Sequence, residues 1–212
     1  MKEGVGLKSK QHWEEIYSKR APDAVSWFQP HAETSLRLIQ QAAAGPLARV
    51  IDVGGGASTL IDDLLAANFV QPTVLDLSGA AIAKTRQRLG KRSDDAQWIE
   101  ADITQVDLPA QAYDVWHDRA VFHFLTDAAD RAAYVRTVLH AVKPGGHVIV
   151  ATFAEDGPLQ CSGLPVVRYQ PGQLHAEFGQ PFELVAHEKE AHQTPGGAVQ
   201  QFVYCFCRRL AG

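Results

Sequence analysis

Apolar residues along the chain form short consecutive runs that alternate with stretches of helical spacing. The runs are typical of buried parallel strands, and the stretches have the i, i+3, i+4 spacing of helices that cover a sheet. The predicted strands are residues 49–53, 73–77, 97–100, 113–117 and 147–153. The predicted helices are a short amphipathic one around Trp13, Ile16 and Tyr17, then residues 33–44, 59–68, 78–89, and a longer helix from Thr126 or Asp127 to about Val142. This alternation favours an α/β fold with helices on both faces of a mostly parallel sheet.

Beyond residue 153 the pattern weakens. Residues 155–170 are rich in Gly, Pro and Ser and have too little periodicity for a helix or a strand. A short helix is expected at 172–178. Two closing strands are expected at 182–186 and 200–207, with residues 190–197 in the connection between them. Such a pair suggests an antiparallel addition to the parallel sheet.

Composition narrows the class of protein. A length of 212 residues suits one sizeable domain, and a net charge of −4 without a basic cluster gives no electrostatic signal for nucleic acid. No apolar run approaches the roughly 18–20 residues of a membrane span, and the polar N-terminus has no secretion signal. Cys161, Cys205 and Cys207 cannot all pair, which suggests a reducing compartment. We therefore expect a cytoplasmic protein, a monomer or a homodimer, with no nucleic-acid or membrane partner.

The most specific chemical signal is a glycine turn after the first predicted strand. The sequence Val-Ile-Asp-Val-Gly-Gly-Gly-Ala-Ser occupies residues 50–58. Gly54, Gly55 and Gly56 have no Cβ, so the backbone can take positive φ and a ligand can approach it closely. The helix that follows offers free N–H groups at its start. Asp52 precedes the glycines, where a carboxylate is badly placed for a pyrophosphate and suits an ammonium or hydroxyl groups.

Three acidic residues stand where the first three predicted strands end: Asp52, Asp76 and Asp102. In an open α/β sheet, ligands bind beyond the carboxyl ends of the strands. Three carboxylates gathered there match the ammonium, the ribose diol and the adenine amine of S-adenosylmethionine. Asp76 is placed to accept hydrogen bonds from both ribose hydroxyls.

Taken in order, these motifs resemble those of class I S-adenosylmethionine-dependent methyltransferases. The resemblance runs from Val50 to Phe153 and rests on residues 50–58, 75–78, 101–103 and 142–146. It implies a doubly wound, seven-stranded sheet in the order 3-2-1-4-5-7-6 with an antiparallel last strand. It also implies one domain over residues 1–212. The parts expected within that domain are an N-terminal lid segment (1–30), a cofactor-binding core (46–153) and a substrate-loop region (154–199).

The resemblance also implies which residues hold the cofactor. By this resemblance, Asp52 and the glycines Gly54, Gly55 and Gly56 hold the methionine end. The ribose falls to Asp76 with its neighbour Leu77, and the adenine to Asp102 with Ile103. Ser58 stands where many relatives have another glycine, and as a small capping residue it should still fit.

The end of the fourth predicted strand lies beside the methionine end of the cofactor in that family. Asp118 is expected nearest to the methyl donor, through its carbonyl or its carboxylate, and Arg119 is expected to contact the substrate. His123 follows between two phenylalanines. It is either a packed residue or a base that takes a proton from a thiol, hydroxyl or amine. Asp118 and His123 are therefore the candidate catalytic residues.

The N-terminal segment 13–28 is similar to the leading segment of some methyltransferases that modify protein lysines. Their fourth strand typically continues as Asp-Lys-Gly-Thr-Leu-Asp-Ala, whereas this chain has Asp-Arg-Ala-Val-Phe-His-Phe at 118–124. His123 replaces the second acid, which speaks against a lysine acceptor. Tyr17 and Trp27 are candidates for a lid over the cofactor, since closure excludes water from the transfer. The alternative for both is ordinary packing of an N-terminal helix.

Two further segments are candidates for the substrate pocket. The segment 156–165 follows the fifth strand, where that family builds its pockets, and 190–195 should reach the same rim. We expect Cys161 and His192 to line the pocket, with an inert buried thiol as the alternative for Cys161. Cys205 and Cys207 share one face of a strand, which favours core packing, and no metal site is predicted.

These observations favour an enzyme that uses S-adenosylmethionine to methylate a small-molecule nucleophile: a thiol, hydroxyl, amine or carboxylate. A protein-lysine N-methyltransferase is the alternative. An NAD-dependent oxidoreductase would want Gly-x-Gly-x-x-Gly, but Thr59 stands at the last position and Asp52 would be unexplained. A non-catalytic S-adenosylmethionine-binding protein is a further alternative, against which an intact pocket with an aromatic lid argues.

Overall fold

The computed structural model describes residues 3–211, and seven strands form its main sheet. These strands are β1 (Val50–Val53), β2 (Thr73–Asp76), β3 (Gln97–Glu100), β4 (Tyr113–Arg119), β5 (Val142–Phe153), β8 (Phe182–Gln193) and β9 (Val199–Arg209). Their order is β3-β2-β1-β4-β5-β9-β8. The first five pair in parallel, and β9 runs antiparallel to both β5 and β8. The predicted topology is therefore confirmed.

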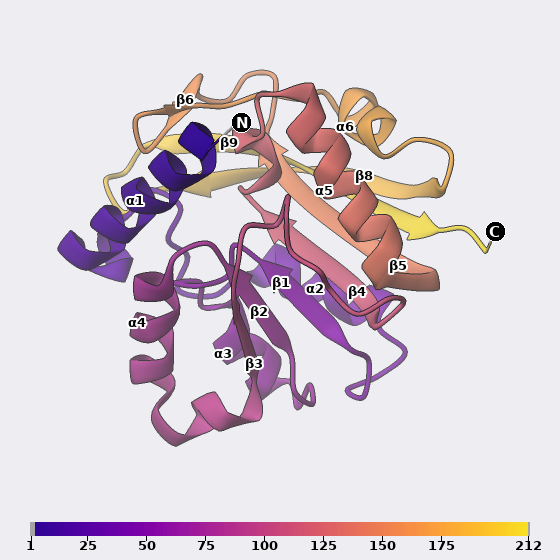
Figure 1. The fold of residues 1–212 in the computed structure, drawn as a ribbon, viewed down its shortest axis with the longest axis horizontal. Coiled ribbons are helices and arrows are strands. Elements are labelled where there is room, and N and C mark those ends of the chain that lie inside the picture. Colours follow the sequence, from indigo (N-terminus) through magenta and orange to yellow (C-terminus); the bar gives the residue numbers. More distant parts are fainter. Residues whose placement is uncertain (1–2, 212) are drawn as a thin grey trace.

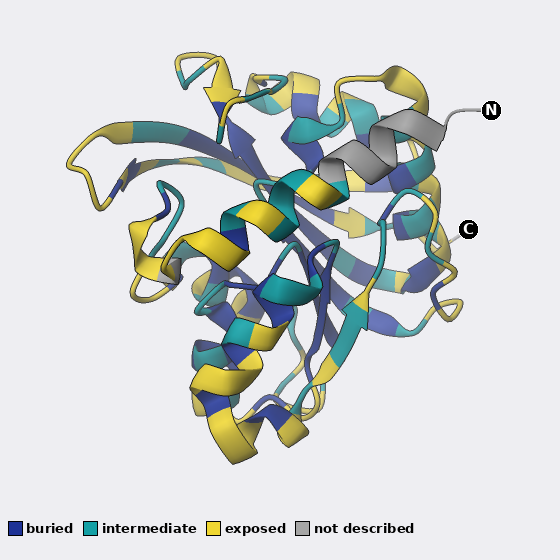
Figure 2. Cartoon of the chain, turned by 60° about the vertical axis from the view of Figure 1, so that its left-hand side comes forward, coloured by how far each residue is buried: buried dark blue, intermediate teal, exposed yellow. Residues whose placement is uncertain are grey.

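Helices cover both faces of the sheet (Figure 1). The α-helices are α1 (Glu3–Lys19), α2 (Glu33–Ala42), α3 (Leu60–Ala66), α4 (Gly79–Leu89), α5 (Ala128–Ala141) and α6 (Pro171–Phe178). Apolar side chains of α2 and α3 pack with one side of β4 and β5, and those of α5 and α6 pack with the other side. Helix α1 packs against α4. The strands in the middle of the sheet are consequently buried (Figure 2).

Local sequence signals set several element boundaries as expected. The Ser78 hydroxyl accepts a hydrogen bond from the N–H of Ala81 at the start of α4, and Gly90 ends that helix with φ +58°. At α5 the Asp127 carboxylate accepts from the N–H of Ala129. Side-chain acceptors at these positions satisfy N–H groups that have no partner within the helix.

The last two strands are longer than the sequence pattern predicted. Strand β8 continues to Gln193, and its residues 190–193 pair with β9, so the expectation of a loop at 190–197 was wrong for its first half. The turn is confined to residues 194–198, where the N–H of Thr194 bonds to the carbonyl of Ala198. Glu188, Glu190 and His192 point inward in alternation with exposed neighbours. Because the inward residues are polar, the alternation was invisible as a hydrophobic pattern.

Strand β5 also begins earlier than predicted, at Val142. Its pairing with β4 passes from Val142 directly to His147, so residues 143–146, expected as a turn, form an irregularity within the strand. Residues 155–170 contain only the two-residue strands β6 (Gln160–Cys161) and β7 (Leu164–Pro165), which pair as a small hairpin. Three short 3₁₀ segments complete the described elements: η1 (Pro22–Ala24), η2 (Gly90–Asp95) and η3 (Phe122–Phe124).

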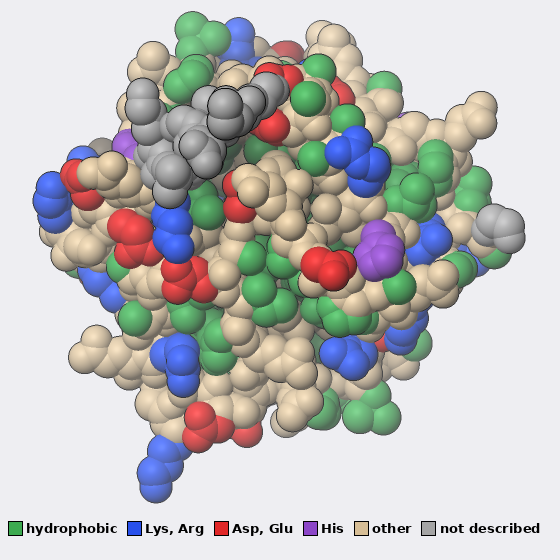
Figure 3. Space-filling view, in the orientation of Figure 1, with side chains coloured by type: hydrophobic (Ala, Val, Ile, Leu, Met, Phe, Trp, Pro, Cys, Tyr) green, Lys and Arg blue, Asp and Glu red, His purple; other side chains and the backbone are tan. Residues whose placement is uncertain are grey.

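The surface has no single electrostatic character on the face seen in Figure 3. Lys and Arg side chains are spread among acidic ones rather than gathered together. No helix within residues 3–211 combines the length and apolar character needed to cross a membrane.

The register of the central strands decides what meets at the carboxyl end of β1. Asp52 is the partner of His117 on β4, and Val53 is the partner of Asp118. Successive residues of a strand point to opposite faces. Asp52 and His117 therefore share the face covered by α2 and α3, while Asp118 points toward α5.

Candidate active site

The glycine turn after β1 brings its backbone against the Asp52 side chain. Gly54 has φ +75° and donates to the carbonyl of Leu75 at 2.7 Å. A Cβ built on Gly55 would lie 2.1 Å from Oδ2 of Asp52. Any larger residue at Gly55 would displace this carboxylate, so glycine is required there.

Asp76 lies at the other side of the turn. Its carboxylate accepts from the N–H of Gly56 at 2.9 Å and from the N–H of Ser78 at 2.8 Å. A Cβ on Gly56 would lie 2.6 Å from this carboxylate. Burial raises the pKa of Asp76 to about 6, an effect that the two backbone hydrogen bonds oppose. Its unused lone pairs are available to hydroxyl donors, as expected for a ribose site.

The predicted adenine residues lie at the end of β3. Asp102 accepts from the N–H and the hydroxyl of Thr104 and from the amide of Gln105, so its carboxylate fixes the local turn. Ile103 is buried in the core, and Leu77 is half-buried. None of the three lines the cavity described next.

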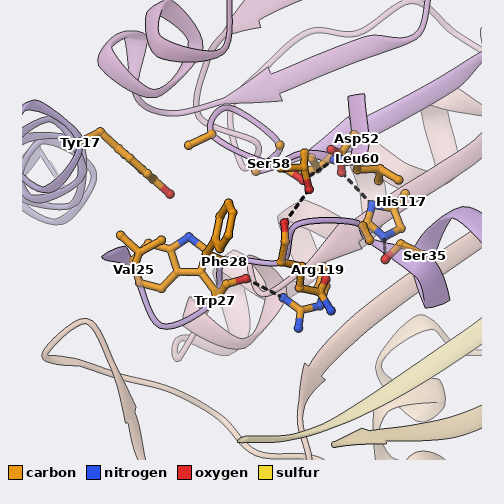
Figure 4. Close-up of a pocket in the computed structure, with 17 residues that line it drawn as sticks. Tyr17, Val25, Trp27, Phe28, Ser35, Asp52, Ser58, Leu60, His117 and Arg119 are labelled. Carbon is orange, nitrogen blue, oxygen red and sulfur yellow. Dashed lines mark hydrogen bonds and ion pairs between the residues drawn. The ribbon is translucent and has the colours of Figure 1, made fainter. Parts of the chain in front are cut away.

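A small cavity of about 50 Å³, partly open to solvent, lies beside the glycine turn (Figure 4). Its walls come from α1, the segment 25–29, α2, the carboxyl ends of β1 and β4, and the turn itself. The lining residues on which the argument depends are Tyr17, Trp27, Ser35, Asp52, His117 and Arg119. The structure thus brings together predicted residues from distant parts of the chain.

The aromatic residues predicted as a lid do close one side of this cavity. Tyr17 is buried, and its ring packs edge-on against Trp27 with 6.3 Å between centroids. Trp13 also packs against both rings. On α1, the Glu14 carboxylate accepts from the N–H of Ala80 at the start of α4. These contacts join the N-terminal segment to the cofactor side of the sheet.

Residues 26–29 are hydrogen-bonded on both sides. The carbonyl of Gln29 accepts from the Thr59 hydroxyl at 2.8 Å, next to the glycine turn. On the opposite side, the carbonyl of Ser26 lies 2.7 Å from Nε2 of His192, and the carbonyl of Trp27 accepts from Arg119 at 3.3 Å. The segment therefore bridges the turn and β8.

His117 is the centre of a buried hydrogen-bonded chain. Its Nδ1 lies 2.7 Å from Oδ1 of Asp52, and its Nε2 lies 2.9 Å from Oγ of Ser35. Ser35 in turn lies 3.3 Å from Oη of Tyr204 on β9. Oδ2 of Asp52 is buried and has no hydrogen-bond partner within the described residues.

Arg119 and Glu190 form a second polar group in the same wall. Arg119 Nη2 lies 3.0 Å from Glu190 Oε1, and its Nε donates to the Tyr204 hydroxyl at 3.1 Å. The guanidinium carbon lies 4.1 Å from the centroid of the Phe202 ring. Although burial works against its charge, the pKa of Glu190 is lowered by Arg119 and by hydrogen bonds from Thr34, Arg119 and Tyr204.

The two predicted catalytic residues lie elsewhere. The Asp118 carboxylate accepts from the N–H groups of Val121 and Phe122 and from the Tyr134 hydroxyl, and burial raises its pKa to about 6. His123 is fully buried, 4.5 Å from the Phe124 ring and 4.7 Å from the Phe153 ring between centroids. Burial lowers the pKa of His123 to about 3. Neither side chain lines the cavity.

Of the predicted substrate residues, Arg119 lines this cavity, whereas Cys161 and His192 do not. Cys161 is buried among apolar residues, and burial raises its pKa to about 12. His192 lines a neighbouring, more open groove between residues 28–34 and 190–193, which shares Phe28 and Gln29 with the cavity. Cys205 and Cys207 are buried on one strand with their sulfurs 3.1 Å apart.

Sequence reasoning did not single out Ser35 and His117, which line the cavity, or Tyr204 behind them. Glu190 lies in the segment 190–195 that was expected at the rim, and it lines the neighbouring groove. His117 stands at the end of a predicted strand, a position that could have indicated it, whereas Ser35 and Tyr204 lie on segments whose packing together no local pattern reveals.

The residues around the cavity fit S-adenosylmethionine. A buried carboxylate oxygen without a partner, Oδ2 of Asp52, is suited to an ammonium, because such an oxygen is costly unless something pairs with it. The glycine turn leaves room that a Cβ would fill, and Asp76 retains acceptor capacity for hydroxyls.

Comparison with known proteins agrees with this fit. Residues 51–148 match a family model described as a methyltransferase domain. The eEF1A lysine and N-terminal methyltransferase of Danio rerio is 24% identical over 180 residues, which cover 84% of this chain and 26% of that protein. Nodulation protein S of Sinorhizobium fredii is 32% identical over 127 residues, which cover 60% of this chain and 56% of that protein. The chain therefore spans about a quarter and about half the lengths of these relatives.

A solved structure extends the likeness to nearly the whole chain. Burkholderia thailandensis 1,6-didemethyltoxoflavin-N1-methyltransferase, with bound 1,6-didemethyltoxoflavin and S-adenosylhomocysteine, matches with a TM-score of 0.67 at 17% identity. The match covers 97% of this chain and 85% of that one. The family model and the solved structure relate residues 51–148 to a methyltransferase domain, and the sheet has the strand order that the resemblance implied.

Proposed function

We propose that this chain transfers the methyl group of S-adenosylmethionine to a small-molecule nucleophile that lies beside Arg119 and Glu190. The observation that carries the proposal is the cavity between the glycine turn and residues 26–29, which Asp52 lines on the side of the turn and Arg119 lines at the end of β4. The N-terminal residues 1–30 act as the lid, 46–153 as the cofactor core and 154–199 as the substrate-loop region.

Little acid–base chemistry is asked of the protein. When bound, S-adenosylmethionine supplies an electrophilic methyl group on a sulfonium that leaves without acid assistance. Asp52 and Asp76 orient the donor, and Tyr17 and Trp27 exclude water from the side that they close. Holding the acceptor in line at about 3 Å can contribute roughly 7–11 kcal/mol toward the barrier.

A small acceptor is supported by how the cavity is bounded. Residues 26–29 are tied to Thr59 on one side and to Arg119 and His192 on the other. The adjoining groove shares Phe28 and Gln29 with the cavity, and we propose this groove as the route of the acceptor. The acceptor contacts that we propose are Arg119, His192 and Cys161. Of these, Cys161 is buried behind the residues that line the cavity. Oligomeric state does not enter the proposal.

A protein acceptor is the second candidate. The relative from Danio rerio is named as a lysine and N-terminal methyltransferase, and residues 13–28 resemble the leading segment of such enzymes. A lysine side chain entering through the same groove would meet Glu190, whose charge is already paired with Arg119.

Methyl transfer from labelled S-adenosylmethionine distinguishes these functions. The protein is incubated with panels of thiols, phenols, amines and carboxylates and, separately, with protein extracts, and the products are divided by ultrafiltration. We expect label in the small-molecule filtrate, and none with Asp76→Ala, which removes the acceptor for the ribose hydroxyls. Label on protein alone would overturn the small-molecule proposal. S-adenosylhomocysteine binding without any transfer would indicate a non-catalytic protein.

A further inference from the structure

His117 is fully committed to two partners on different elements. On β4, its Nδ1 faces Asp52 of β1 and its Nε2 faces Ser35 of α2, at 2.7 and 2.9 Å. All three side chains are buried, with exposed fractions of 2% for Asp52 and His117 and 1% for Ser35. Because both ring nitrogens are already hydrogen-bonded, His117 has no nitrogen left for the molecule that receives the methyl group. It can only hold its two neighbours in place.

The neighbour that it holds is the carboxylate of the donor site. Oδ1 of Asp52 is bound to His117 (Figure 4), which fixes the carboxylate, and among residues 3–211 Oδ2 has no hydrogen-bond partner. Glycine at position 55 leaves the space that Oδ2 occupies, since a Cβ there would lie 2.1 Å from it. The free oxygen is therefore pre-oriented, which lowers the entropy lost when a ligand binds.

We propose that His117, held in turn by Ser35, is a positioning residue for the ammonium group of the methionine part of the cofactor. The inference rests on the use of S-adenosylmethionine in the proposed function. His117 acts through Asp52, whose carboxylate it fixes by the bond to Oδ1. Ser35 fixes the ring of His117 from α2.

Calorimetry with two ligands tests the positioning role. S-adenosylhomocysteine carries the ammonium, whereas 5′-methylthioadenosine has the same ribose and adenine but no amino-acid part. We expect His117→Phe to weaken S-adenosylhomocysteine binding about tenfold or more, by loss of a fixed charged partner. Binding of 5′-methylthioadenosine should change less than about twofold. His117→Asn, whose amide can replace the Nδ1–H donor, should recover most of the loss, and Ser35→Ala should cost about threefold.

Three other results would overturn either the role of His117 or the cofactor assignment. If both ligands weaken equally in His117→Phe, the residue is merely structural and the proposal fails. Unchanged S-adenosylhomocysteine affinity in that variant overturns it as well. Should the unmodified protein bind neither ligand, the cofactor assignment itself fails, which is distinguishable from failure of the His117 role.

Discussion

The donor side and the acceptor side of the cavity are built in different ways. On the donor side, two carboxylates are fixed by backbone two residues away: Asp76 by the N–H of Ser78, and Asp102 by the N–H of Thr104. The third, Asp52, is bound by His117, which is 65 residues away. On the acceptor side, Arg119 meets Glu190 and Tyr204, which are 71 and 85 residues away in sequence. Local turns thus fix Asp76 and Asp102, whereas Asp52 and the acceptor wall depend on packing.

This difference predicts different responses to substitution. A substitution on the donor side displaces a carboxylate at the glycine turn, so it should lower ligand affinity more than it lowers the stability of the fold. An acceptor-side change leaves a buried charge without its partner and should affect stability first. Because loops and closing strands vary independently of the sheet that carries them, one donor site can serve many acceptors.

The largest expected effect is on the donor side, with Gly55→Ala. The added Cβ would lie 2.1 Å from Oδ2 of Asp52 and displace the carboxylate. We expect S-adenosylhomocysteine affinity to fall about a hundredfold or more by calorimetry, with a melting temperature within a few degrees of the original, roughly 2–4 °C. Gly172→Ala, at a position with nothing within 4 Å, is the matched control and should change neither quantity. Affinity retained in Gly55→Ala would mean that Asp52 does not contact the ligand.

On the acceptor side, Arg119→Met should destabilise the fold. It leaves Glu190 with an unpaired charge at a site where its side chain is 14% exposed. Removing one partner of a buried pair costs about 3–5 kcal/mol, so urea unfolding should show about 3 kcal/mol after allowance for partial exposure. The double variant with Glu190→Gln should recover part of this loss. A cost below about 1 kcal/mol would show that the pair behaves as a surface ion pair.

The smallest expected effect concerns Asp76 and pH. Burial raises the pKa of this carboxyl to about 6, so the ionised form that accepts ribose hydroxyls is lost as the pH falls through 6. Affinity for 5′-methylthioadenosine, which carries the ribose and the adenine but no amino-acid part, should drop about tenfold between pH 7.5 and pH 5. Asp76→Asn should bind more weakly and without this dependence. A flat profile in the unmodified protein would contradict the raised pKa.

The two histidines near the end of β4 show where sequence reasoning succeeds and where it stops. His123 attracted attention because of its position after the strand, yet the structure surrounds it with Phe124 and Phe153. His117, six residues earlier, carries the contacts to Asp52 and Ser35. Alternation along a strand shows which residues of that strand share a face. Whether Asp52 and His117 lie on the same face follows only from the register between β1 and β4.

The long β8 gives the same lesson. Its inward residues Glu188, Glu190 and His192 are polar, so the hydrophobic pattern ended at the apolar start of the strand. The segment is held as a strand by its pairing with β9 along residues 182–193. Contacts of Glu190 with Arg119 and of His192 with Ser26 add to this pairing. Tertiary contacts here override the local signal.

By itself, the sequence determined the alternation of strands and helices, the sheet order through its resemblance to a family, and the donor site. These follow from short-range physics: periodicity, glycine at positive φ, and acids capped by neighbouring N–H groups. Only the tertiary structure decided that His117 and Ser35 hold Asp52, that Arg119 pairs with Glu190, and that His123 is enclosed. Those contacts join segments far apart in the chain, and their existence depends on register and packing that no local pattern encodes.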